Sequence, residues 1–377
     1  MIKRIAVVII ILNFQFSIFN SVANAQDMQL CSLHNGNMEM NVINYGARIQ
    51  TLKFAGQDMV LGFDTLDTYT KKKQNFGATV GRYIGRILGG KLPITYKEGK
   101  SSDAKLRLQG KKIHTETYQL QVGGNGDCSH GGTPGFSQQF WTITSHNDTT
   151  CTLRFVSPDG ENGFPGELTL DVTYTLQHDA LRIDYAATTT KPTVLNPSNH
   201  SFFNLSANLG ETVHDELLWI NSDSTALYNS SKQVTGKLAS ITDTPFDFRH
   251  PTPIGQRINA DNEQLKVTKG YDHCYKLNNI NGLRTPVARL TDISTGISME
   301  VYTTEPAMQI YTANSHNGSI IGKQGKPYIK QNAICFETMH FPDSPNNPQW
   351  PSTQLNPGET FHSTTIFKFS AFKKYSP

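Results

Sequence analysis

Two short segments of the sequence carry side chains that could move protons. They are Asn199-His200-Ser201-Phe202-Phe203-Asn204-Leu205, and Cys335-Phe336-Glu337 followed by Met339-His340-Phe341-Pro342-Asp343. An imidazole and a carboxylate can act as acid and base near neutral pH. His200 and Glu337 therefore predict acid–base chemistry, provided that the fold brings the two segments together.

Both residues also have a purely structural interpretation. His200 could be a buried histidine that binds a neighbouring carbonyl group, and Glu337 could be an exposed carboxylate on a strand. The apolar neighbours favour a site beside a hydrophobic wall, because Phe202 and Phe203 follow the histidine and Phe336 precedes the glutamate. Burying a carboxylate without a partner is costly, so a buried Glu337 would call for a functional reason.

The elements that must position these residues have the pattern of β-strands. Short runs rich in Val, Ile, Thr, Tyr and Phe are separated by Gly, Asn, Asp and Pro, which is typical of a β protein. Residues 177–179 predict a turn between strands at 167–176 and 180–186, which form an antiparallel hairpin. Residues 364–372 predict a further strand. Alternation in the first strand places one apolar face on Leu168, Leu170, Val172, Tyr174 and Leu176.

The pattern predicts a single all-β domain over residues 26–377. No long amphipathic helix, internal repeat or linker divides this part of the sequence. An all-β domain of this size needs several strand layers, as in two extensive antiparallel sheets packed face to face. In such a large antiparallel β-supersandwich, residues from distant strands can meet at one site.

The pattern of residues 1–25 predicts a signal peptide. Lys3 and Arg4 precede an apolar run, and Ala23-Asn24-Ala25 offers a cleavage site of small residues. The apolar run is too short to span a bilayer, and no later segment approaches the roughly 20 apolar residues required. We therefore expect a protein exported to the periplasm or the extracellular space, without a membrane span.

Charge and cysteine content argue against several classes of site. The chain has 34 basic and 31 acidic residues, and this near balance argues against a nucleic-acid partner. Its five cysteines lack CxxC or zinc-finger spacing, so they neither define a disulfide framework nor exclude one bridge. Glu337 and His340 would point to opposite faces of a strand, which argues against a metal pair. We expect an uncharged substrate, no metal and no cofactor.

The order of motifs along the chain resembles the galactose mutarotase, or aldose 1-epimerase, family. Each motif is weak alone, but together they cover nearly all of residues 26–377 in the expected order and spacing. The resemblance implies a β-supersandwich with its sugar site in an open cleft on one sheet. The matching segments are Asn44-Tyr45-Gly46-Ala47, Phe76-Gly77-Ala78-Thr79-Val80-Gly81-Arg82-Tyr83, His130-Gly131-Gly132, Gly135-Phe136, Asn199-His200, Gly270-Tyr271-Asp272-His273, Glu337 and Pro357-Gly358-Glu359.

This resemblance implies that the protein interconverts the α and β anomers of free aldoses of the galactose or glucose type. The sugar ring must open, the C1–C2 bond must rotate, and the ring must close on the other face of the carbonyl. By resemblance, Glu337 is the base that takes the proton from the C1 hydroxyl, and His200 is the acid that protonates the ring oxygen. Each positioned partner contributes roughly 10²–10⁴-fold to the rate.

The resemblance also implies four substrate-binding residues. His130 would hydrogen-bond the sugar from a segment whose glycines let the backbone approach a ligand closely. Asp272 and Arg86 would hold sugar hydroxyl groups, and Gln309 would contact the substrate. Taken without the resemblance, His130 and Asp272 could be turn residues, and Arg86 could be a surface arginine.

Three positions differ from the usual pattern of the family. Gly85 stands where an asparagine is usual, Phe202 where a tyrosine is usual, and Ser129 where a leucine is usual. The first two differences remove an amide and a phenol that could contact sugar. Because the proton-transfer residues are present, we expect an altered sugar preference rather than lost chemistry.

Two other functions are compatible with the sequence. A hexose-phosphate epimerase of the same superfamily would need a cluster of positive residues, and its substrate would be unusual outside the cytoplasm. A non-catalytic carbohydrate-binding protein could keep the cleft without turnover, although the presence of both His200 and Glu337 argues against it. We expect a monomer or a weak dimer.

Overall fold

The computed structural model describes residues 27–97, 113–206, 208–278 and 281–372. The predicted signal peptide, residues 1–25, lies outside these ranges. In this part of the chain the helices are few and short, and the α-helices are α1 (Leu66–Lys71) and α2 (Glu263–Thr268). Within the described ranges, no helix has the length and apolar character needed to cross a bilayer.

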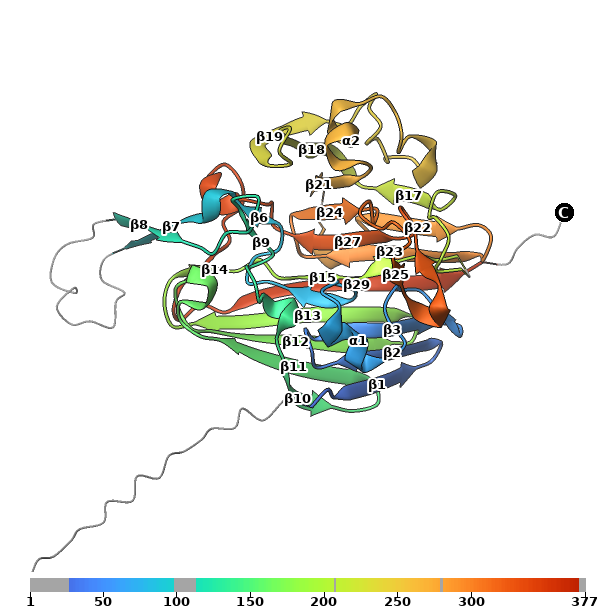
Figure 1. Ribbon diagram of the computed structural model, residues 1–377, viewed down its shortest axis with the longest axis horizontal. Helices are drawn as coiled ribbons and strands as arrows, with labels where there is room; N and C mark the ends of the chain where they lie inside the picture. The colour runs from blue at the N-terminus through green and yellow to red at the C-terminus, as the bar shows by residue number, and fades with distance from the viewer. Residues whose placement is uncertain (1–26, 98–112, 207, 279–280, 373–377) are drawn as a thin grey trace, which may run out of the picture.

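The largest sheet has nine strands, and every neighbouring pair in it is antiparallel (Figure 1). The predicted hairpin is confirmed, because Leu168 lies opposite Thr189 and alternate residues of the first strand are buried. The strand predicted at 364–372 is also present. In spatial order the strands are β10 (Thr142–His146), β11 (Thr150–Ser157), β12 (Leu168–Gln177), β13 (Ala180–Thr189), β29 (Phe361–Ala371), β23 (Ile297–Thr303), β22 (Ala288–Asp292), β17 (Leu217–Ile220) and β20 (Thr252–Pro253).

A second antiparallel sheet, of six strands, carries three of the predicted site residues. Glu337 lies on β27, Gln309 on β24 and Asp272 on β21. The order across the sheet is β16 (Phe202–Phe203), β27 (Ile334–Met339), β24 (Ala307–Tyr311), β21 (Asp272–Leu277), β18 (Ser222–Tyr228) and β19 (Val234–Ser240).

Smaller sheets complete the strand layers. A four-stranded sheet contains β1 (Leu30–Asn35), β2 (Met38–Ile43), β3 (Arg48–Phe54) and β4 (Gln57–Asp58). The two-stranded ladders are β5 (Ala78–Val80) with β15 (Ser198–His200), β6 (Arg86–Ile87) with β9 (Cys128–Ser129), β7 (Lys91–Lys97) with β8 (Ile113–Gln119), β14 (Thr193–Val194) with β28 (Gln354–Leu355), and β25 (Ile320–Ile321) with β26 (Pro327–Tyr328).

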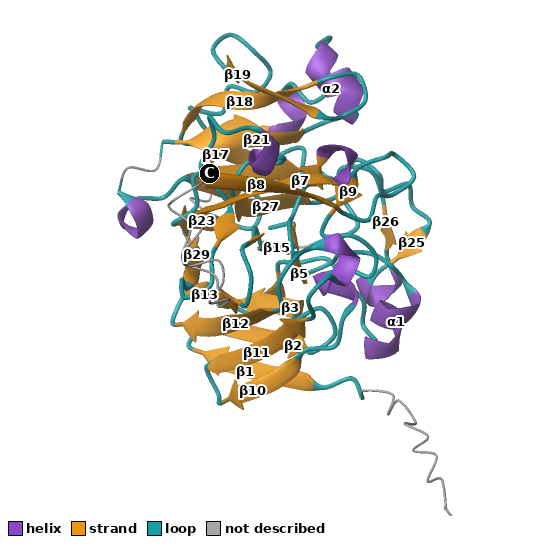
Figure 2. Cartoon of the chain, turned by 90° about the vertical axis from the view of Figure 1, so that its left-hand side faces the viewer, coloured by secondary structure: helices purple, strands orange, loops and turns teal. Residues whose placement is uncertain are grey.

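One large hydrophobic cluster joins the nine-stranded sheet to the four-stranded and six-stranded sheets. Phe203 shows the connection, because its ring centroid lies 6.2 Å from that of Phe336 on β27 and 4.9 Å from that of Phe367 on β29. Figure 2 shows β1–β3 and β10–β12 at one end of the molecule, β18, β19 and α2 at the other, and β15 and β27 between them. The predicted antiparallel β-supersandwich is confirmed.

Candidate active site

A cavity of about 850 Å³ lies where strands of the six-stranded sheet meet β15 and the β6–β9 ladder. Its lining brings together side chains that are far apart in the sequence. The placement agrees with the predicted site, whereas the chemical roles of the residues stay predictions. The predicted residues that line the cavity are Arg86, His130, His200, Asp272, Gln309 and Glu337.

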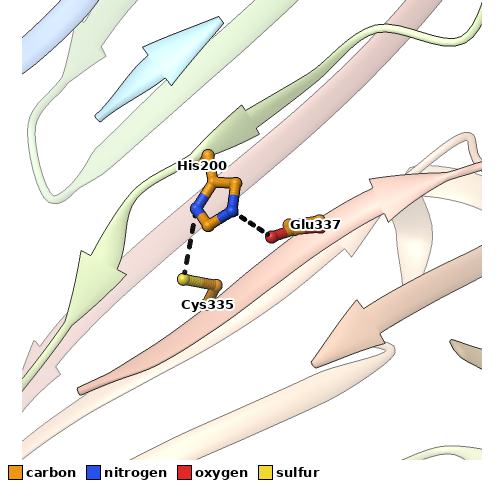
Figure 3. Close-up of side chains that lie close together, drawn as sticks. All are labelled: His200, Cys335 and Glu337. Atoms are coloured by element: carbon orange, nitrogen blue, oxygen red, sulfur yellow. Dashed lines mark hydrogen bonds and ion pairs between the residues drawn. The ribbon is translucent and has the colours of Figure 1, made fainter. Parts of the chain in front are cut away.

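The predicted acid and base are direct neighbours. Nε2 of His200 lies 3.0 Å from Oε1 of Glu337, and the two side chains are only 8% and 5% exposed (Figure 3). Nδ1 of His200 lies 3.5 Å from Sγ of Cys335. The Glu337 carboxylate is therefore buried with a partner, which offsets part of the cost of burying its charge.

Strand register explains why residues so far apart in sequence converge. Phe202 on β16 pairs with Cys335 on the antiparallel strand β27. Extending this register by two residues places His200 opposite Glu337, and the period of two puts Cys335 and Glu337 on the same face. On the other side of β27, Gln309 pairs directly with Glu337.

The surroundings of His200 favour its protonated form. Burial by itself lowers the pKa of this imidazole, but attraction by the Glu337 carboxylate and their hydrogen bond outweigh burial, so the pKa is raised above its usual value. A raised pKa extends the pH range over which the ring stays positively charged. His200 is thus suited to donate a proton.

The surroundings of His130, in contrast, favour its neutral form. Burial, assisted by the nearby positive charge of His200, lowers the pKa of His130 to about 4. The backbone N–H of Gly85 donates to its Nδ1 at 3.4 Å, so the proton of the neutral ring is on Nε2. The rings of His130 and His200 have centroids 6.0 Å apart. His130 can therefore donate a hydrogen bond to a ligand while remaining uncharged.

Asp272 and Gln309 form a hydrogen-bonded row beside the acid–base pair. Nε2 of Gln309 donates to Oδ1 of Asp272 at 2.7 Å, and the Tyr228 hydroxyl donates to Oε1 of Gln309 at 3.2 Å. Nζ of Lys232 lies 3.9 Å from Oδ2 of Asp272. Burial raises the pKa of Asp272 despite the opposing effects of Lys232 and Gln309. The row fixes the direction of polar groups that a sugar hydroxyl could contact.

Arg86 enters the cavity from the two-residue ladder of β6 and β9. Its Nη1 lies 3.5 Å from Oδ2 of Asp127, a buried carboxylate that also accepts from the Gly89 N–H at 3.0 Å. The Arg86 side chain is 30% exposed. This anchored guanidinium can offer hydrogen bonds to adjacent hydroxyl groups.

The three unusual residues occupy different places. Gly85 and Ser129 line the cavity. Phe202 is buried, and its ring stacks on His200 and on His316 with centroids 4.9 and 5.4 Å away. The phenyl ring of Phe202 thus packs against the imidazole of His200, the candidate catalytic acid.

Several residues that line the cavity are not evident from the sequence. Tyr228 and Lys232 lie on and beside β18, where the alternating pattern gave no chemical signal, whereas Tyr311 and His316 follow Gln309 closely in sequence. Nδ1 of His340 lies 2.7 Å from Oε2 of Glu305.

Comparison with known proteins identifies the family. The model of the aldose 1-epimerase family matches residues 29–110 and 99–368. The chain is 35% identical to the galactose mutarotase of Mus musculus over 90% of this chain and 93% of that protein, and 30% identical to the aldose 1-epimerase of Escherichia coli strain K12 over 92% and 97%. The crystal structure of galactose 1-epimerase from Lactobacillus acidophilus superposes with a TM-score of 0.77 at 29% identity, covering 93% of this chain and 96% of that chain. The chain belongs to the aldose 1-epimerase family.

Proposed function

We propose that this protein is an aldose 1-epimerase, an isomerase that interconverts the α and β anomers of free aldoses. The observation that carries the proposal is the buried pair of His200 and Glu337, 3.0 Å apart in the cavity lining. The C1 hydroxyl and the ring oxygen of an aldose are both bonded to C1. One acid and one base in contact with each other are therefore placed to reach both oxygens together.

In ring opening, one of the two residues accepts a proton and the other donates one. The Glu337 carboxylate accepts the proton of the C1 hydroxyl while protonated His200 delivers a proton to the ring oxygen, so that neither a free alkoxide nor an oxocarbenium ion has to form. The C1–O5 bond breaks and C1 becomes an aldehyde. Rotation about C1–C2 exposes the other carbonyl face, and ring closure returns both residues to their starting protonation states.

The remaining cavity residues would bind and orient the sugar. Neutral His130 donates from Nε2, and the carboxylate of Asp272 accepts from sugar hydroxyl groups. Gln309 is held between Tyr228 and Asp272, which limits its rotation. Such orientation keeps the reacting oxygens against the acid–base pair.

Polarimetry tests this proposal. Purified protein is added to freshly dissolved α-D-galactose and α-D-glucose, and the rate above spontaneous mutarotation is compared with that of Glu337→Gln. We expect acceleration by the wild type and a loss of roughly 10²–10⁴-fold in the variant. A folded wild-type protein that accelerates no aldose, pentoses included, yet binds sugar would instead support a carbohydrate-binding protein.

A second substrate class has one observation in its favour. Arg86, Lys232, Lys269 and Lys330 all line the cavity, and a hexose phosphate would require such positive groups. Arg86 and Lys232 face Asp127 and Asp272, respectively, which weakens their attraction for a phosphate. The same polarimetric assay with hexose 6-phosphates decides the matter, since a phosphate epimerase would prefer them to the free sugars.

We also propose that the protein acts after export. The proposal rests on Lys3 and Arg4, the apolar run after them and the small residues at 23–25. N-terminal sequencing of the protein from its native cell should give Gln26 as the first residue. An intact N-terminus in the soluble cell contents would contradict export.

A further inference from the structure

The acid–base pair has a third buried neighbour that the proposed reaction does not use. Figure 3 shows Cys335 and Glu337 projecting from the same strand toward His200. One potential ligand atom from each of the three residues lies within 4.8 Å of the other two. All three side chains are buried, yet His200 and Glu337 also line the open cavity.

The chemistry of this trio suits a soft divalent cation. Imidazole, thiolate and carboxylate are the side-chain ligands of Zn²⁺ in proteins, whereas Mg²⁺ and Ca²⁺ prefer oxygen alone. Zinc bonds of about 2.0 Å to nitrogen and about 2.3 Å to sulfur, at a tetrahedral angle, place the two ligands about 3.5 Å apart. Nδ1 of His200 and Sγ of Cys335 already have this separation, 3.5 Å.

We propose that His200, Cys335 and Glu337 form a binding site for a zinc-like divalent cation, which blocks proton transfer to and from the sugar while it is bound. The three protein ligands leave a fourth position toward the cavity, as in open zinc sites. An ion on Nδ1 draws the Glu337 carboxylate away from Nε2, because one ion cannot reach both ring nitrogens. The ion thereby removes the acid and the base at once.

Binding of the cation is balanced by the release of protons. The Cys335 thiol becomes a thiolate and releases one proton, and imidazolium at His200 becomes a neutral ligand and releases another. The Glu337 carboxylate binds without a change in protonation. No electron transfer is involved. The block of catalysis rests on the proposed function, but formation of the metal site does not.

Cobalt absorption tests the site directly, because tetrahedral Co²⁺ bound to a thiolate has visible ligand-field bands and a near-ultraviolet sulfur-to-metal band. Titration of the whole purified protein with Co²⁺ should give both bands at one ion per chain, and Zn²⁺ should abolish them. Cys335→Ser should lose the sulfur band, and Glu337→Gln should bind at least tenfold more weakly. Cys274→Ser is the matched control, since this buried cysteine lies on β21 of the same sheet but is not part of the group of three potential ligands, and it should keep the bands.

Two results would overturn the site: no cobalt bands in the folded wild type, or a sulfur-to-metal band that survives Cys335→Ser. For the block of catalysis, Zn²⁺ should lower the apparent kcat for the sugar, and a chelator should reverse the effect. Cobalt bands without inhibition would refute the block of catalysis alone. If no aldose is turned over, the proposed epimerase function fails, while the cobalt titration still decides whether the metal site exists.

Discussion

The cavity has two unlike walls. One, here called the strand wall, comprises His200, Asp272, Gln309 and Glu337, which lie on strands paired in register within or beside the six-stranded sheet. The other, the loop wall, comprises Gly85, Arg86, Ser129 and His130 around the two-residue β6–β9 ladder. The main hydrophobic core includes Met308, Ile310 and Phe336 on the strands of the strand wall, whereas the loop wall is anchored by Asp127 and by a smaller hydrophobic cluster that includes Ile87 and Cys128.

The difference between the walls suggests a division of labour. Proton transfer needs donor and acceptor fixed to a fraction of an ångström, and rigid paired strands provide this. Sugar preference can change through side chains on short connections outside the two main sheets. Two of the three departures from the usual family pattern, Gly85 and Ser129, lie on the loop wall. The third, Phe202, lies behind the strand wall.

The largest expected contrast is between the two histidines. His200→Asn removes the proton donor and should lower kcat by roughly 10²–10⁴-fold. His130→Asn removes a neutral hydrogen-bond donor worth about 0.5–1.5 kcal/mol and should mainly raise KM, by roughly 2- to 13-fold. Steady-state polarimetry on both variants measures the contrast.

Circular dichroism and thermal unfolding of the two variants provide the control, because both substitutions replace a buried ring. Equal losses in kcat from two folded variants would show that the loop wall supplies part of the proton transfer. The proposed division between the walls would then be wrong.

Within the strand wall, substitution of Asp272 should have the next-largest effect on activity. Asp272→Asn removes a charged acceptor for sugar hydroxyls, an interaction worth about 1.5–3 kcal/mol, and should lower kcat/KM by roughly 10- to 150-fold. Lys232→Met is the matched control, because it removes the ion pair but keeps the carboxylate. If Lys232→Met causes the same loss, the ion pair rather than sugar binding accounts for the effect.

Much of the strand framework could be predicted from the sequence. The alternation of Leu168 through Leu176 identified a half-buried strand, and local patterns of this kind identified the fold class. The proposed roles of His200 and Glu337 came from residue type and motif order, not from periodicity. Their contact depends on the pairing of Phe202 with Cys335, and a long-range register of this kind leaves no local trace in the sequence.

The rest of the site could not be predicted from the sequence, for physical reasons. Arg82 and Tyr83 belong to a family motif, yet the Arg82 guanidinium is buried and donates to the carbonyl groups of Pro165 and Gly166, so this part of the motif supports the scaffold. Lys232 and His316 enter the cavity from turns. Whether a polar residue in a turn faces solvent or a cavity depends on tertiary packing, which sequence pattern does not encode.

The opposite protonation of the two histidines predicts the pH profile. Because the pKa of His200 is raised above 6.5, activity should persist above that pH and fall about tenfold per pH unit beyond the folded pKa. His130, with a pKa of about 4, should add no step between pH 5 and 9. The raised pKa also contributes stability, which is fully present below about pH 6.5 and is lost as pH rises through the folded pKa.

NMR titration of the imidazole signals measures the two pKa values separately. In Glu337→Gln the pKa of His200 should fall below its usual value, because burial remains while the attracting carboxylate is gone. The pKa of His130 should stay low. An unchanged pKa for His200 in this variant would show that Glu337 does not hold its proton.

The smallest expected effect comes from restoring the usual asparagine on the loop wall. Gly85 has φ of +79°, a conformation that asparagine tolerates better than other side chains, and a Cβ there would meet Pro342 at 3.4 Å and Met339 at 3.5 Å. Gly85→Asn should therefore fold with a loss of about 1 kcal/mol in unfolding free energy.

The asparagine keeps the backbone N–H that sets the tautomer of His130 and adds an amide worth about 0.5–1.5 kcal/mol to a matching sugar. KM for galactose relative to glucose should shift by roughly 2- to 13-fold, with kcat within about twofold. Gly85→Val, which is strained at this φ, separates backbone strain from the gain of the amide. A fall in kcat with an unchanged ratio of KM values would mean that the loop wall positions the acid–base pair, because a wall that only selects sugars cannot slow the chemistry of every sugar alike.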